Sequence, residues 1–278
     1  MHLRLYDAHN HLQDGRLSSN LEQILRAIGD EPIAKMVVNG SCEEDWPAVL
    51  ALAEKSPQVI PSFGYHPWYV KQRTLSWQNQ LARFLDRIPS AIGEIGLDRW
   101  IKDYDLEEQE AVFKWQLNLA AERELPVSIH CLQAWGKLLE LLESGPRPMC
   151  GFVLHSYGGP QEMIAPLADL GAYFSLPGYF AHARKAKHRE TFKHVPSDRL
   201  LIETDAPDQL LPQERIRHPL LDRESGKQLN HPANLRAVYE FASELLAESI
   251  ESLAERVERN FLRIFGRLCP GKPGENAK

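Results

Sequence analysis

The stretch LRLYDAHNH, residues 3–11, joins a short apolar run to a group of metal-binding side chains. If the run forms a strand, His9 and His11 project from the same face, because strand side chains alternate with a period of two. The same arrangement recurs along the chain. The further examples are Glu94 after Ala91–Gly93, His130 after Val127–Ile129, His155 after Phe152–Leu154, Asp205 beyond Leu200–Ile202, and His66 at the end of Val59–Tyr65.

The chemistry of these side chains predicts a metal site. Imidazole nitrogens and carboxylate oxygens suit zinc, manganese or a similar divalent ion. Four histidines and two carboxylates are too many for one tetrahedral ion, but they fit two ions that share a bridging carboxylate. The pattern therefore predicts a hydrolase with two divalent metal ions, which we expect to be zinc, manganese or magnesium.

Eight apolar runs alternate with segments of helical spacing, such as Leu21, Ile24, Leu25 and Ile28. The predicted strands are Leu3–Asp7, Lys35–Gly40, Val59–Gly64, Ala91–Gly93, Val127–His130, Gly151–His155, Ala172–Leu176 and Leu200–Glu203. This alternation is typical of parallel βαβ units. Eight units favour a closed TIM-type (β/α)₈ barrel of the α/β class, which gathers all strand C-termini around one mouth. An open sheet would spread them along a line.

We expect one domain over residues 1–268 and a disordered tail over residues 269–278. Residues 206–232 carry four prolines and no clear periodicity, which predicts a long loop at the catalytic face, and two helices should follow near 233–246 and 250–266. Ser76 is a predicted helix cap, and Asp105 with Glu108 resembles a capping box.

The bulk composition narrows the class of protein. The net charge of −6 argues against a nucleic-acid binder held by overall charge, although a local basic patch is compatible with it. The four cysteines are scattered, as expected for free thiols in a reducing compartment. Neither a signal-peptide core nor an apolar run of about 18 residues is present. We therefore expect a cytoplasmic monomer with no membrane contact and no obligate protein partner.

The carboxylates have distinct expected roles. Glu94 would be costly to bury without a cation, so it is the predicted bridge between the ions. Two ions would lower the pKa of a bound water, and Asp205 would hold and deprotonate that water. The second ion would polarise the oxygen of the bond being cut.

The same residues, in this order, resemble the TatD family of metal-dependent hydrolases, within the amidohydrolase-like superfamily. The motifs are DAHNHL (7–12), GYHP (64–67), GEIGLD (93–98), LPVSIH (125–130), LHSYGG (154–159), ETDAP (203–207) and NFLRIFG (260–266). The resemblance covers residues 5–266. It implies one ion held by His9, His11, Glu94 and Asp205, and a second held by Glu94, His130 and His155. It also implies a catalytic role for His66 near the substrate phosphate, and activity on DNA.

The substrate-binding segments depart from the family pattern. Residues 156–159 are SYGG rather than a Cys-Phe-Ser-Gly-like stretch, residues 99–102 are RWIK, and the loop 208–229 is long. Arg99 is a predicted substrate-binding residue. The other basic residues expected at the mouth are Lys102, Arg184, Lys185, Arg215 and Arg217, and the aromatic residues expected to stack on bases are Trp68, Trp100, Trp135 and Tyr179.

Three functions are compatible with these residues. The first is a deoxyribonuclease that cleaves phosphodiester bonds. The second is an aminoacyl-tRNA deacylase, or a small-molecule ester or amide hydrolase, which would use the same water. The third is a non-catalytic metal-binding partner module. The presence of Asp205 argues against the third, because a scaffold does not need a base.

Overall fold

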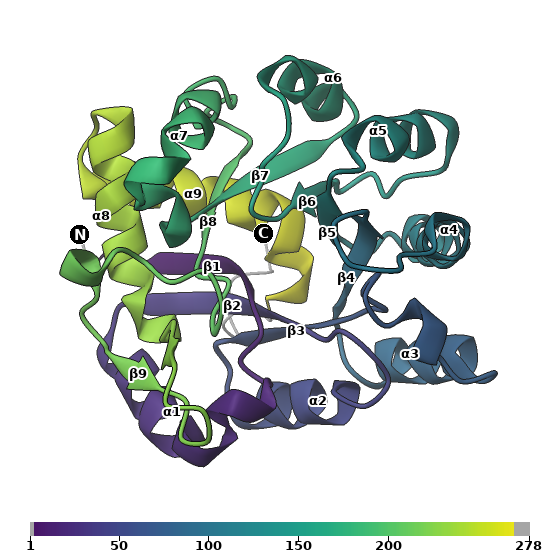
Figure 1. The fold of residues 1–278 in the computed structure, drawn as a ribbon, viewed down its shortest axis with the longest axis horizontal. Coiled ribbons are helices and arrows are strands. Elements are labelled where there is room, and N and C mark those ends of the chain that lie inside the picture. Colours follow the sequence, from purple (N-terminus) through teal and green to yellow (C-terminus); the bar gives the residue numbers. More distant parts are fainter. Residues whose placement is uncertain (1–2, 270–278) are drawn as a thin grey trace, which may run out of the picture.

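Eight parallel strands pair in chain order from β1 to β8 and form the barrel at the centre of the fold (Figure 1). The computed structural model describes residues 3–269. The strands are β1 Leu5–Asn10, β2 Ile33–Asn39, β3 Val59–Phe63, β4 Ala91–Asp98, β5 Val127–Leu132, β6 Phe152–Leu154, β7 Ala172–Pro177 and β8 Leu200–Glu203. The predicted TIM-type barrel is confirmed, and all eight predicted runs contribute a strand. The strands are buried on both faces, as parallel strands under a layer of helices must be.

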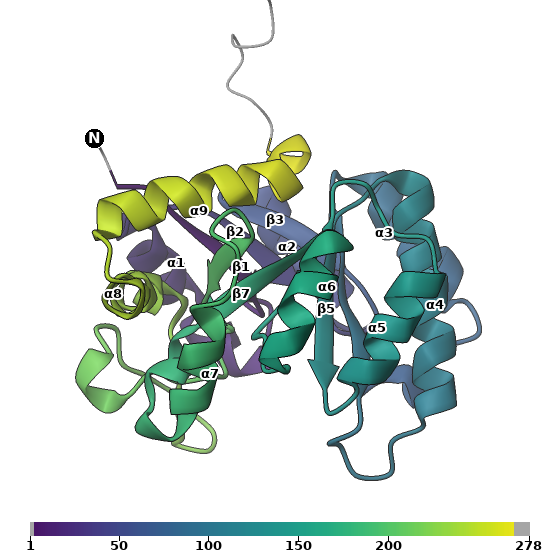
Figure 2. The same cartoon turned by 90° about the horizontal axis from the view of Figure 1, so that it is seen from above.

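Helices surround the barrel and close one of its ends. The helices are α1 Leu21–Asp30, α2 Trp46–Lys55, α3 Trp77–Arg87, α4 Leu106–Arg123, α5 Trp135–Ser144, α6 Ile164–Asp169, α7 Ala186–Phe192, α8 Leu235–Leu246 and α9 Ile250–Phe265. The short 3₁₀ helices are η1 Gly15–Asn20, η2 Val70–Gln72, η3 Gln161–Met163, η4 Gly178–Ala181, η5 Ala183–Lys185, η6 Gln213–Arg215, η7 Pro232–Asn234 and η8 Gly266–Leu268. Figure 2 shows α9 lying across one end of the barrel. Asn260 of α9 donates to the carbonyl of Leu200 at the start of β8, so this is the N-terminal end of the strands.

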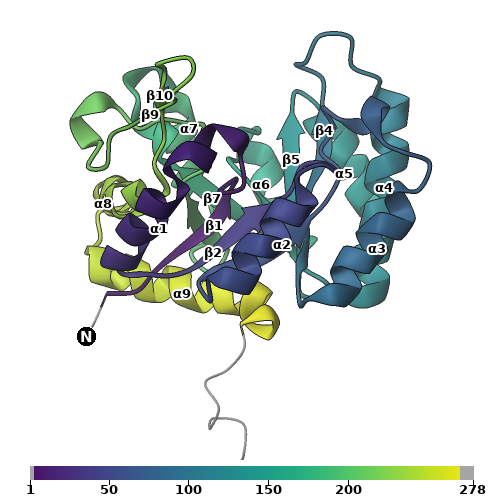
Figure 3. The ribbon, with the colours of Figure 1, turned by 90° about the horizontal axis from the view of Figure 1, so that it is seen from below.

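The segment after β8 is ordered, which the sequence pattern did not indicate. It contains an antiparallel pair, β9 Leu220–Leu221 and β10 Gln228–Leu229, and Figure 3 shows this pair on the side opposite α9. Asn234 Oδ1 accepts from the backbone N–H groups of Arg217 and His218. The predicted long loop at the mouth is therefore present. Hydrogen bonds within the loop hold it in place, although its sequence shows neither helical nor strand periodicity.

Four strands run further than predicted. β1 continues to Asn10, β4 to Asp98, β5 to Leu132 and β7 to Pro177, so His9 and Glu94 lie within strands rather than after them. Polar residues face the interior of the barrel at its mouth, and in the sequence they resemble strand ends. β4 and β5 approach closely at Gly96, where a Cβ would collide with the carbonyl oxygen of His130.

The predicted helix caps had different outcomes. The Asp105 side chain accepts from the backbone N–H of Glu108, which confirms that cap. The Glu108 carboxylate instead pairs with Arg73. Ser76 occupies the N-cap position of α3 as predicted, but its side chain makes no capping hydrogen bond. The predicted tail, apart from Cys269, lies outside the described residues.

Side-chain and backbone hydrogen bonds close the barrel where β8 meets β1. The Tyr239 hydroxyl of α8 accepts from the backbone N–H of Tyr6 and donates to the Tyr6 carbonyl, both at 3.0 Å. Asp7 accepts from the Thr204 backbone N–H at 2.9 Å and from its hydroxyl at 2.6 Å. Nearer the mouth, the Asp205 N–H donates to the His9 carbonyl at 3.0 Å. We call this set of contacts the β8–β1 seam.

We expect Tyr239→Phe to lower the free energy of unfolding by about 1–3 kcal/mol, because it leaves a buried N–H and a buried carbonyl of Tyr6 unpaired. Urea denaturation would measure the loss. Tyr69→Phe is the matched control, since within residues 3–269 the Tyr69 hydroxyl bonds to no other residue. Equal stability of the two variants would show that the seam does not depend on this hydroxyl.

Candidate metal centre

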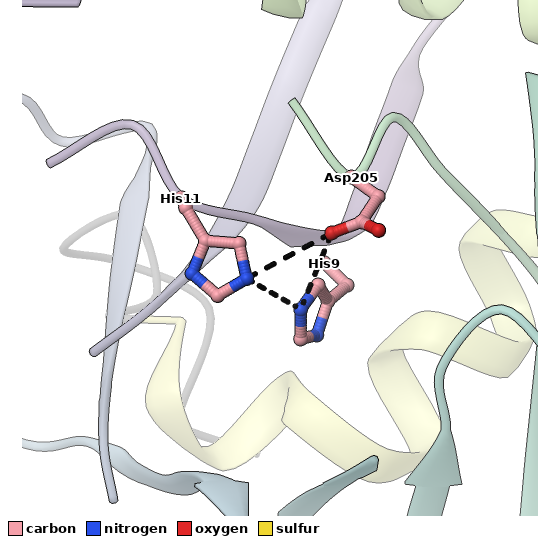
Figure 4. A group of neighbouring side chains, drawn as sticks. All are labelled: His9, His11 and Asp205. Atoms are coloured by element: carbon pink, nitrogen blue, oxygen red, sulfur yellow. Dashed lines mark hydrogen bonds and ion pairs between the residues drawn. The ribbon is translucent and has the colours of Figure 1, made fainter. Parts of the chain in front are cut away.

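Glu94 divides the candidate site into two halves, and the first half faces its Oε2 atom. The side chain projects from the middle of β4, and the residue is 1% exposed. Its Oε2 lies 3.3 Å from His9 Nε2 and 3.1 Å from His11 Nε2. Asp205 Oδ1 completes the group at 3.7 Å from His9 and 3.8 Å from His11 (Figure 4). We call Glu94, His9, His11 and Asp205 the first half-site.

The second half-site consists of Glu94, His130 and His155, with His66 beside them. It faces the other oxygen of the same carboxylate. Glu94 Oε1 lies 2.8 Å from His155 Nε2, 3.0 Å from His130 Nδ1 and 3.2 Å from His66 Nε2. All six predicted ligands, together with His66, therefore converge on one point at the C-terminal mouth of the barrel. One carboxylate with a group of imidazoles at each oxygen has the form of a bridge between two cations.

Hydrogen bonds fix the tautomers of two histidines in the form that ligands require. His11 Nδ1 lies 2.8 Å from the Asn39 carbonyl, which can only accept, so in the neutral ring Nδ1 carries the proton and Nε2 the lone pair. His130 Nε2 lies 2.9 Å from the Asp98 carboxylate, so its lone pair is on Nδ1. Both lone pairs face oxygens of Glu94, and two acceptors at this distance need a cation between them. The residues present therefore fit divalent metal ions.

His66 is held in the opposite state. Its Nδ1 accepts from the backbone N–H of Trp68 at 3.1 Å, which places the proton on Nε2. Burial lowers the pKa of His66 to about 4, so the ring is neutral. A neutral ring with Nε2–H directed at the centre is a hydrogen-bond donor. This state suits a phosphate oxygen better than a metal ion.

The electrostatics of the centre favour added positive charge. Burial opposes ionisation of Glu94, but the imidazoles around it, His155 first, hold the pKa of its carboxyl well below the usual range. Burial also lowers the pKa of His11, yet its hydrogen bond to Glu94 outweighs this and raises the pKa to about 10. Burial acts in the same direction on His130, whose bonds to Asp98 and Glu94 raise its pKa to about 9. The carboxylates thus stabilise a proton where a metal ion would sit.

Asp205 differs from Glu94 in its charge state. Burial raises the pKa of Asp205 to about 7, and the neighbouring His155 and His11 oppose the rise. Gln209 Nε2 donates to Oδ2 at 2.6 Å, so one carboxylate oxygen is held from behind while Oδ1 faces the histidines. A carboxylate with a pKa near neutrality can both accept and release a proton.

Five residues around the centre had no role in the sequence analysis. They are Asp98 at His130, Ser128 at His9, the Asn39 carbonyl at His11, Gln209 at Asp205, and Glu203 at 3.9 Å from His155 Nδ1. Strand alternation could have identified three of them. Asp98, Ser128 and Glu203 each lie an even number of residues from Glu94, His130 or Asp205 and so share a face with it.

The predicted basic residues do not all remain available for substrate. Arg215 pairs with Glu244 at 2.6 Å and Arg217 with Glu240 at 2.6 Å, so carboxylates of α8 offset both charges, and their contact with phosphate stays a prediction. Arg184 and Lys185 lie over the Tyr179 ring at 5.1 and 4.9 Å. Arg99 follows β4, with its guanidinium 5.8 Å from the centre of the Tyr104 ring.

Comparison with known proteins identifies the family. The family model described as TatD related DNase matches residues 6–266. The chain belongs to the TatD family. The family and the metal-dependent hydrolase predicted from the motifs are thus confirmed. Among the described residues of this TatD protein, no helix has the length and apolar character needed to cross a membrane.

Relatives of this TatD protein align over almost their whole length. The metal-dependent hydrolase YjjV of Escherichia coli K12 is 29% identical, over 94% of this chain and 98% of its own. The 3'-5' ssDNA/RNA exonuclease TatD of Pantoea vagans is also 29% identical, over 94% of this chain and 99% of its own. The crystal structure of YjjV superposes with a TM-score of 0.85 at 28% identity, covering 96% of this chain and 99% of YjjV.

We expect the metal-loaded protein to contain two divalent ions per chain and Glu94→Gln to contain one at most, because the amide cannot bridge two cations. Elemental analysis after stripping with EDTA, reloading with manganese or zinc and removing free metal would measure this. Glu110→Gln removes an equal charge from α4 and should keep both ions. One tightly bound ion in the unsubstituted protein under saturating metal would contradict the bridge.

Proposed function

We propose that this protein uses two divalent ions to hydrolyse phosphodiester bonds of DNA, at single strands or frayed ends. The observation that carries the proposal is the division of Glu94, whose two oxygens face separate groups of histidines. Ions held in the two half-sites would lower the pKa of a water molecule and stabilise negative charge on a phosphate. His9, His11, His130 and His155 would hold these ions together with Glu94 and Asp205.

Two side chains act directly on the reactants in this proposal. Asp205 accepts a proton from the attacking water, which the orientation imposed by Gln209 favours. His66 donates its Nε2–H to an oxygen of the bound phosphate, since its Nδ1 is occupied by the Trp68 backbone. Neither side chain has to change its orientation for these steps, because both already face the centre.

A polyanionic substrate fits the cations that lack partners around the mouth. Among residues 3–269, Arg99, Arg184 and Lys185 form no ion pair with an acidic side chain. Arg184 and Lys185 follow β7 on η5, and Arg99 follows β4, so they lie on loops at the C-terminal end of the strands. Relatives named 3'-5' ssDNA/RNA exonucleases also support an unpaired nucleic-acid strand as the substrate.

We expect Asp205→Asn to lower the turnover number by about 10²–10⁴-fold, because the amide cannot accept the proton from water. Binding of a single-stranded oligonucleotide should change little. Steady-state hydrolysis and fluorescence anisotropy would separate the two effects. Asp208→Asn is the control, since this exposed carboxylate three residues away pairs with Arg16 rather than with the centre. Near-normal hydrolysis by Asp205→Asn with metal still bound would show that Asp205 is not the base.

We expect cleavage of single-stranded DNA to depend on added metal and to weaken steeply as salt rises, since the net charge of −6 leaves only a local patch to bind phosphates. The measurement compares single-stranded DNA, duplex DNA, an aryl phosphodiester and an aminoacyl ester over a range of salt. Hydrolysis of the aminoacyl ester with single-stranded DNA left intact would favour the deacylase instead.

A further inference from the structure

One buried carboxylate outside the two half-sites connects the metal centre to the surface. Asp98 is fully buried at the end of β4. Its Oδ2 accepts from the indole N–H of Trp68 at 2.7 Å and lies 2.9 Å from His130 Nε2. Its Oδ1 accepts from the backbone N–H of Trp100 at 2.7 Å. Asp98 therefore fixes a predicted metal ligand and an indole ring at the same time.

Trp68 is exposed in a way that packing does not explain. The residue is 47% exposed, although its only polar atom points inward to Asp98. Its ring centre lies 5.0 Å from that of His66, nearly perpendicular at 87°, and 6.3 Å from that of His130. The solvent-facing part is therefore apolar ring surface, and a hydrogen bond to a buried charge holds the ring rigidly beside the centre.

The surroundings favour a nucleobase as the occupant of this surface. Arg99 and Lys102 flank Trp100 on the adjacent loop, and within the described chain neither pairs with an acidic side chain. An apolar ring beside the proposed phosphate-binding centre, with cations on the loop that follows Asp98, matches a nucleotide, which joins an aromatic base to an anionic backbone. A peptide or lipid would satisfy the ring but not the charges.

We propose that Trp68 is the platform on which one unpaired base of the substrate stacks, while a phosphate of the same or the adjoining nucleotide lies beside His66 at the metal centre. This inference rests on the proposed nuclease function and adds a base-binding residue to it. A base reaches the exposed ring face only after leaving its neighbour in a duplex. Trp68 would thereby select unpaired ends. Asp98 would be a positioning residue, because it holds the Trp68 ring at a fixed place relative to His130.

Abasic oligonucleotides test the platform directly. The probes are single strands that are intact or lack one base at the first, second or third nucleotide from the 3′ end. Binding is measured by fluorescence anisotropy in EDTA, so the result does not depend on metal content, and hydrolysis is then measured with manganese. One abasic position should weaken binding to the unsubstituted protein about 10-fold, within the range of base–aromatic stacking.

The variants separate stacking from structure. Trp68→Ala should bind the intact and abasic strands equally, whereas Trp68→Phe, which keeps a ring, should retain most of the difference. Leu75→Ala removes an exposed apolar side chain from the same loop and should behave like the unsubstituted protein. Thermal denaturation would establish that each variant is folded.

The possible outcomes distinguish this inference from the function on which it rests. If Trp68→Ala still discriminates against the abasic strand, Trp68 is not the platform, and the nuclease function stands. If no abasic position affects the unsubstituted protein, base stacking is overturned in the same way. If the unsubstituted protein neither binds nor cleaves any oligonucleotide, the nuclease function fails and the platform fails with it.

Discussion

The structure depends on one buried negative charge. Glu94 lies almost entirely out of solvent in the middle of β4, where an uncompensated carboxylate would be strongly destabilising. Five imidazoles from four other strands or their ends compensate it, and they can approach it together only because the barrel brings those strands around one axis. The barrel thus gives this charge its compensating partners, and the polar residues at its mouth lie inside because they surround Glu94.

The neighbours of the histidines decide what each ring can do. Proximity alone places His11, His130 and His66 in one cluster around Glu94. The carbonyl of Asn39 and the carboxylate of Asp98 leave lone pairs on two of these rings, whereas the backbone N–H of Trp68 leaves a proton on the third. The proposed division between metal ligands and a phosphate donor would therefore arise from the hydrogen bonds that each ring makes with its second nitrogen.

The sequence predicted the barrel and the position of its polar residues at the mouth, because strand periodicity and strand-end position are local properties. It misplaced the ends of β4 and β5, since Glu94 and His130 face the barrel interior and interrupt an apolar pattern without ending the strand. It also missed the pairing of Arg215 and Arg217 with α8, and the β9–β10 pair. These features depend on partners far away in the chain, which no local spacing encodes.

The β8–β1 seam has a consequence for a chain that is still being synthesised. His9 and His11 belong to the first strand, and every other histidine of the centre has been added by residue 155, whereas Asp205 comes directly after the last strand. A nascent chain thus contains five imidazoles and Glu94 well before it contains Asp205. Under the proposed function, such a chain on the ribosome lacks its proton acceptor, and hydrolysis would wait until the ring of strands has closed.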